Sequence, residues 1–106
     1  MLIKFEKDYL RELYQTAKCS EKKYRFQPEV IRSYIKKVML LERISTEEKM
    51  YSFHGLHFEA LIGNKKGLYS IRLNYQYRLE FMITTEETQE CVLTICSLTD
   101  ITNHYR

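Results

Sequence analysis

The segment from residue 63 to residue 81, GNKKGLYSIRLNYQYRLEF, concentrates positive charge. Lys65, Lys66, Arg72 and Arg78 fall within it, and its only acid is Glu80. Guanidinium groups recognise phosphate through paired hydrogen bonds, and lysines add point charges beside it. The spacing of a phosphate-binding P-loop, GxxxxGK followed by Ser or Thr, is absent. These residue types therefore predict an anion site built from a hairpin and a lysine-bearing turn.

The two arginines are expected to face each other across that hairpin. Apolar and polar residues alternate in 68–73 and again in 77–83, as in two half-buried strands. A three-residue loop, 74–76, would place Arg72 directly opposite Arg78, where like charges repel unless an anion lies between them. If the register shifts by two residues, Arg72 pairs with Glu80 in an ordinary cross-strand ion pair. The hairpin alone leaves both readings open.

His104, in the terminal NHYR, is the best candidate for a general acid or base. An unperturbed imidazole titrates near neutral pH, which suits proton transfer under physiological conditions. A lone histidine near a terminus more often has no such role, so the assignment depends on the nearby cations. Arg32 and Lys36, on the polar face of a predicted helix, are further candidates for contact with RNA or phosphate. The alternative for that face is an ordinary solvated helix surface.

Composition limits the classes of protein to which the chain can belong. It has 106 residues, of which 44% are hydrophobic and 29% charged, with three Gly and one Pro. These values predict a single globular domain, 1–106, rather than a disordered chain. The net charge of +3 permits a polyanionic partner without requiring one.

Cysteine usage and hydropathy indicate the cellular compartment in which the protein is expected. The three cysteines include no CxxC pair, which favours reduced thiols over a disulfide framework or a zinc site. Cys91 and Cys96 are expected in or near the core, on one strand. No signal peptide and no apolar run near 18 residues is evident, so a cytoplasmic location without membrane association is expected.

Hydrophobic periodicity predicts an α+β fold. The predicted elements are a strand over 2–6, helices over 7–18 and 28–43, and strands over 68–73, 77–83 and 91–98, with 84–90 as a polar hairpin loop. Because helices precede a run of strands, we expect an N-terminal strand and two helices packed on an antiparallel sheet of about four strands.

The pattern G-x-K-K-G-x-Y-S-I-R-L-N-x-Q-Y-R-L-x-F, followed by a strand and a terminal HY, resembles the RelE/ParE superfamily of bacterial toxins. It is most similar to the HigB-like branch, also called plasmid maintenance killer proteins. The strong match covers about residues 56–106. The N-terminal part of the chain resembles the family only in its predicted elements, a strand followed by two helices of suitable length. The resemblance implies a RelE-like fold and a toxin of a type II toxin-antitoxin system.

The resemblance also implies an activity and its partners. Such toxins enter the A site of the 70S ribosome, cut mRNA during translation and so inhibit protein synthesis. They need no metal or other cofactor, because the ribose 2′-OH attacks the adjacent phosphate and leaves a 2′,3′-cyclic phosphate. The expected partners are a helix-turn-helix antitoxin (HigA-like), the ribosome and mRNA.

Site residues follow from the resemblance position by position. Arg72 and Arg78 would clamp the scissile phosphate, and Lys65 or Lys66 would add positive charge or touch ribosomal RNA. His104 would be the acid or base, and Tyr105 would stack on a base or share the proton transfer.

The general base stays unassigned, because HigB-like chains often carry His and Lys where this sequence has Glu59 and Ile62. Lys65, Lys66 or His57 could substitute, or Glu59 could itself be the base. Two other functions also stay open. One is a ParE-like inhibitor of DNA gyrase without nuclease activity, and the other is a nontoxic relic that only binds an antitoxin or RNA.

Overall fold

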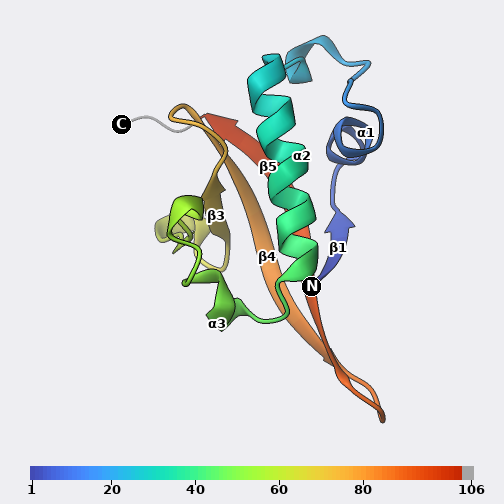
Figure 1. Cartoon of the computed structure of the whole chain (residues 1–106), viewed down its shortest axis with the longest axis vertical. Coiled ribbons are helices and arrows are strands. Elements are labelled where there is room, and N and C mark those ends of the chain that lie inside the picture. Colours follow the sequence, from blue (N-terminus) through green and yellow to red (C-terminus); the bar gives the residue numbers. More distant parts are fainter. Residues whose placement is uncertain (104–106) are drawn as a thin grey trace.

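Two long antiparallel strands, β4 and β5, form the centre of a sheet that helices cover on one face (Figure 1). The computed structural model describes residues 1–103. Its strands and α-helices are, in chain order, β1 (Leu2–Phe5), α1 (Asp8–Thr16), α2 (Pro28–Arg43), α3 (Glu47–Met50), β2 (Glu59–Ala60), β3 (Tyr69–Arg72), β4 (Tyr77–Glu87) and β5 (Val92–Asn103). The predicted α+β class is confirmed.

Helix α2 has the bounds that the sequence predicts. Pro28 occupies its first turn, where a missing N–H costs nothing. Its apolar stripe turns toward the sheet, and the fully buried members are Val30, Tyr34, Val38 and Leu41. The Tyr34 hydroxyl donates a 2.7 Å hydrogen bond to the Leu10 carbonyl oxygen of α1, which joins the two helices inside the core.

The prediction of about four antiparallel strands needs correction. The sheet has five strands in the order β1-β5-β4-β3-β2, and β1 lies parallel to β5, with Leu2 opposite Ile95. Strand β2 is only two residues long and pairs with β3. Periodicity reveals neither feature, because two residues are too short to alternate and because the N-terminal strand pairs with the most distant one in sequence.

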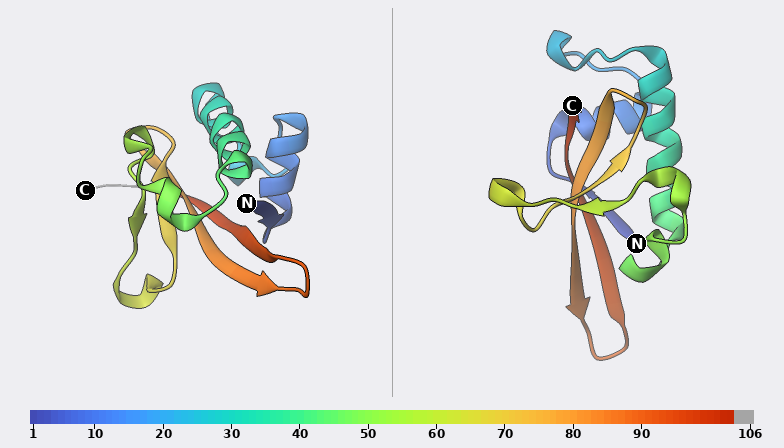
Figure 2. Two further views of the ribbon diagram at one scale, coloured as in Figure 1. Left: turned by 60° about the horizontal axis from the view of Figure 1, so that its bottom comes forward. Right: turned by 90° about the vertical axis from the view of Figure 1, so that its left-hand side faces the viewer.

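The hairpin between β4 and β5 is longer than predicted. Residues 84–87, expected in a loop, continue β4, and both strands project beyond the helices as an arm (Figure 2). At its other end β5 runs to Asn103, beyond the end at residue 98 that the sequence predicts for this strand. Cys91 lies in the short connection of this arm and is exposed, which corrects its assignment near the core.

Alternation along the strands divides the sheet into two faces. Ile71, Leu79 and Phe81 are fully buried in the core that the helices cover. The opposite face of the same strands carries Ser70, Arg78 and Glu80, which are also buried although they are polar. A second, polar interior therefore lies under the segment that connects α3 to β3.

The two cysteines of the β4–β5 region should differ sharply in reactivity. Burial raises the pKa of the Cys96 thiol to about 12, so it stays protonated and unreactive at ordinary pH. We expect a disulfide reagent at pH 8 to modify exposed Cys91 rapidly in the native protein and Cys96 only after unfolding. Cys91→Ser should remove the fast phase. Rapid modification of Cys96 in that variant would contradict the buried position.

Candidate active site

The hairpin of β3 and β4 sets the two arginines opposite each other. The register pairs Arg72 with Arg78 and Ser70 with Glu80, which confirms the predicted three-residue loop. The alternative register, with Arg72 opposite Glu80, is wrong. The Asn74 side-chain oxygen fixes this turn, because it accepts hydrogen bonds from the backbone N–H groups of Gln76 and Tyr77 at 2.9 and 2.7 Å.

Arg78 is the buried cation of the site. Its side chain is 7% exposed, and three partners from two segments, the strand β3 and residues 57–59, hold its guanidinium. Nε donates to Ser70 Oγ at 2.8 Å, Nη2 donates to the His57 carbonyl oxygen at 2.8 Å, and Nη2 lies 3.3 Å from Glu59 Oε1. A buried charge needs such partners, because desolvation would otherwise cost several kcal/mol.

Charges around Arg78 act in opposite directions on its pKa. Burial lowers the pKa of Arg78, and the positive charge of Arg72 lowers it further. The carboxylates of Glu59 and Glu80 raise it. A guanidinium remains protonated under these influences, so the site keeps a fixed positive charge beside two carboxylates.

Glu80 forms a second polar centre on the same face. Its side chain is 9% exposed, and Oε2 lies 2.8 Å from Lys65 Nζ. The same oxygen accepts a 3.0 Å hydrogen bond from Thr102 Oγ1 on β5. One buried carboxylate therefore joins the lysine-bearing turn to the end of β5.

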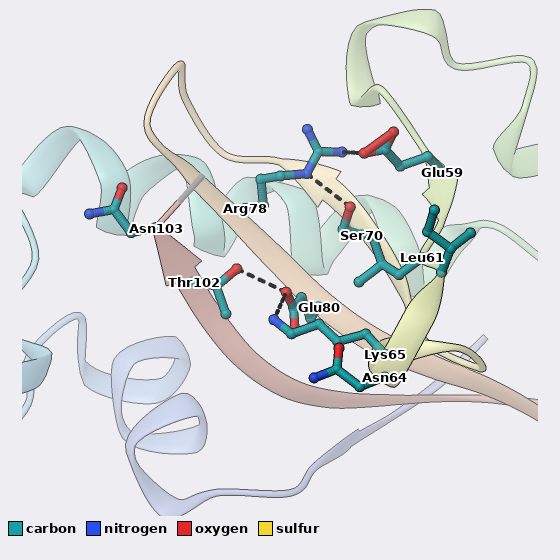
Figure 3. A pocket seen from close by; sticks show the side chains of 10 residues that line it. Glu59, Leu61, Asn64, Lys65, Ser70, Arg78, Glu80, Thr102 and Asn103 are labelled. Atoms are coloured by element: carbon teal, nitrogen blue, oxygen red, sulfur yellow. Dashed lines mark hydrogen bonds and ion pairs between the residues drawn. The ribbon is translucent and has the colours of Figure 1, made fainter. Parts of the chain in front are cut away.

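These two centres open into one cavity of about 320 Å³ (Figure 3). Its lining residues come from the 59–65 segment and from strands β3, β4 and β5: Glu59, Leu61, Ile62, Asn64, Lys65, Ser70, Arg78, Glu80, Thr102 and Asn103. The side chains of Lys65, Arg78, Glu59 and Glu80 give the cavity two cations and two carboxylates. Such a set can bind an anion and transfer protons.

The structure separates the other predicted site residues from this group. Arg72 lies on the strand beside Arg78 but does not line the cavity, and neither does exposed Lys66. Arg32 and Lys36 are exposed on α2, which covers the opposite face of the sheet.

His104 and Tyr105, the predicted catalytic residues at the end of the chain, lie outside the described residues. Asn103, which immediately precedes His104 in the sequence, lines the cavity.

The sequence did not predict the polar lining residues Asn64, Ser70, Thr102 and Asn103, nor the role of Glu80 as the partner of Lys65. Alternation placed Ser70 and Glu80 on the correct face, but nothing in the pattern indicated burial of that face.

Within residues 1–103, no three His, Cys, Asp or Glu side chains group closely enough to bind a metal ion. None of the helices in that range has the length and apolar character that a bilayer crossing requires.

Known proteins share both the sequence and the fold of this chain. Residues 3–94 match the family model of the HigB-like toxins, described as the RelE-like toxin of the type II toxin-antitoxin system HigB. Over 82 residues the chain is 34% identical to Toxin HigB-1 of Vibrio cholerae serotype O1, an alignment that covers 76% of this chain and 82% of that protein.

A solved structure, the YoeB/ParE toxin from Agrobacterium tumefaciens, superposes with a TM-score of 0.58 over 99% of this chain and all of that one. The two sequences are 15% identical, so this likeness concerns the fold alone. Together the family match over most of the sequence and the α+β architecture lead to one conclusion: the chain belongs to the HigB-like toxins of type II toxin-antitoxin systems, within the RelE/ParE superfamily.

Proposed function

We propose that this toxin is a ribosome-dependent endoribonuclease that cuts mRNA in the A site and thereby inhibits translation. The observation that carries the proposal is the cavity in which Arg78, Lys65 and Glu59 converge. A phosphodiester that gains negative charge needs cations beside it, and a ribose 2′-OH needs a nearby base. The antitoxin of a type II pair would keep this activity in check, and a HigA-like helix-turn-helix protein is the partner we propose.

The fixed position of Arg78 suits it to hold the scissile phosphate. Ser70 and the His57 carbonyl oxygen orient its guanidinium before any substrate arrives, so little reorganisation is needed on binding. Lys65 contributes a second positive charge from the turn. Arg72, at the edge of the same hairpin, would contact the neighbouring phosphate of the RNA rather than the reacting one.

Glu59 is the general base that the geometry supports best. Its side chain is 54% exposed and lies beside the guanidinium that would hold the phosphate. In the reaction, the 2′-OH would give its proton to Glu59 while its oxygen forms a bond to phosphorus. The P–O5′ bond breaks, and His104 would protonate the departing 5′-oxygen. His104 directly follows Asn103, a cavity residue, in the sequence.

Inducible expression in a bacterium tests the reaction class. Within minutes of induction, we expect new mRNA 5′ ends inside translated codons, and we expect His104→Gln to abolish them. Glu86→Gln, on the exposed arm, is the matched control and should leave the cuts in place. Growth arrest with intact mRNA would contradict the nuclease and favour gyrase inhibition. Absence of any growth effect would favour a relic.

Glu59→Gln should slow the chemical step without weakening ribosome binding. Loss of a general base typically costs about 10²–10⁴ in rate, and the amide cannot accept the proton. We expect single-turnover cleavage on programmed ribosomes to fall by that factor, while the toxin concentration for half-maximal rate stays near the wild-type value. Glu86→Gln again serves as the control. An unchanged rate in Glu59→Gln would remove Glu59 from the mechanism.

A further inference from the structure

Among residues 1–103, the carboxylate of Glu80 is a buried charged group that has no part in the proposed reaction. It lies on the polar face of β4, and its Oε2 contacts both Lys65 Nζ at 2.8 Å and Thr102 Oγ1 at 3.0 Å. Its own backbone oxygen accepts a hydrogen bond from Thr99 Oγ1 at 3.0 Å. Residues from the turn and from β5 therefore meet at this single glutamate (Figure 3).

The two ion pairs of the cavity are built in opposite ways. In the Arg78–Glu59 pair the cation is buried, with a side chain 7% exposed, and the carboxylate is 54% exposed. In the Lys65–Glu80 pair the carboxylate is buried, at 9%, and the lysine is 48% exposed. A half-exposed carboxylate can move from its partner into water at low cost, whereas a buried one cannot lose its cation cheaply. The first pair can therefore exchange with a substrate, and the second is fixed.

Lys65 needs such a fixed partner to be useful in a site. A lysine side chain is a flexible four-carbon stem, and this one projects from an exposed turn between Gly63 and Gly67, both at positive φ. An ammonium group has three donors, and the contact with Glu80 occupies one of them. The remaining donors are available to a phosphate while the charge is held in place.

We propose that Glu80 is a positioning residue, which aims the Lys65 ammonium into the cavity and ties the end of β5 to it through Thr102. Its effect on cleavage rests on the proposed nuclease function. The contact itself does not, so the two can be tested separately. Because His104 follows Thr102 by two positions in the sequence, the same carboxylate would link the lysine to the strand that leads to the proposed acid.

Nuclear magnetic resonance of the lysine ammonium groups tests the contact without any substrate. Ammonium protons held by a buried carboxylate exchange slowly with water and give a signal at low temperature and mildly acidic pH. Lys65→Arg assigns that signal by its disappearance. We expect the signal in wild type and Glu59→Gln, and we expect its loss in Glu80→Gln. Persistence of the signal in Glu80→Gln would overturn the positioning role.

A double-mutant cycle on programmed ribosomes tests the consequence. We expect Glu80→Gln to lower the single-turnover rate roughly 10- to 100-fold, as misplacement of a charged group does, with no change in the half-saturating toxin concentration. In a Lys65→Met background the same substitution should cause no further loss, because Glu80 acts through Lys65. Glu86→Gln is the control with wild-type rate. Thermal unfolding verifies that each variant is folded. If Glu80→Gln does not fold, Glu80→Asp, which keeps the charge, takes its place.

The outcomes separate the two proposals. An equal fold-loss on Glu80→Gln in both backgrounds, or no loss in either, would overturn the positioning role while leaving the nuclease intact. If the wild-type protein cuts no mRNA, the nuclease proposal fails. The ammonium signal then decides the role of Glu80 alone: its loss in Glu80→Gln supports the proposal, and its persistence overturns it.

Discussion

A buried arginine on the central hairpin is the constraint on which this site depends. Arg78 lies on the face of β4 that turns away from the helices, so its charge requires acceptors from elsewhere in the chain. Ser70 supplies one from the neighbouring strand, and the 57–59 segment supplies the His57 carbonyl oxygen and the Glu59 carboxylate. The contacts with one guanidinium thus help to hold that segment at the edge of the sheet, where Glu59 and Ala60 pair with β3 as a short fifth strand.

The molecule consequently has two interiors with different chemistry. The apolar one, between the sheet and α1 and α2, stabilises the fold by ordinary burial of residues such as Phe81 and Tyr34. The polar one holds Arg78 and Glu80 under the connection to β3, and no buried side-chain nitrogen or oxygen in the described part of the chain lacks a hydrogen-bond partner. A rigid apolar layer therefore supports a preorganised charged layer, which is an arrangement suited to stabilising a reacting anion.

Sequence periodicity predicted what depends on local pattern, and it failed where distant segments meet. The bounds of α2 and the register of Arg72 and Arg78 followed from apolar spacing and from a three-residue loop. The parallel pairing of β1 and the two residues of β2 did not, because nothing local marks either one. In the site, alternation assigned Glu80 to the polar face, but its partner Lys65 is 15 residues away and its other contact, Thr102, lies on β5. Arg32 and Lys36 had suitable charge and lie on the helix that covers the other face.

We propose that a ribose 2′-oxygen attacks the adjacent phosphate in the cavity that Arg78 and Glu59 line. The most direct test is cleavage, on programmed ribosomes, of an mRNA that carries a single 2′-deoxyribose on the 5′ side of the mapped cut, with analysis of the product ends. We expect this one missing oxygen to abolish the cut, and we expect the all-ribose mRNA to yield a 2′,3′-cyclic phosphate and a 5′-hydroxyl. Continued cleavage of the deoxy substrate, or a 5′-phosphate on the downstream product, would contradict it.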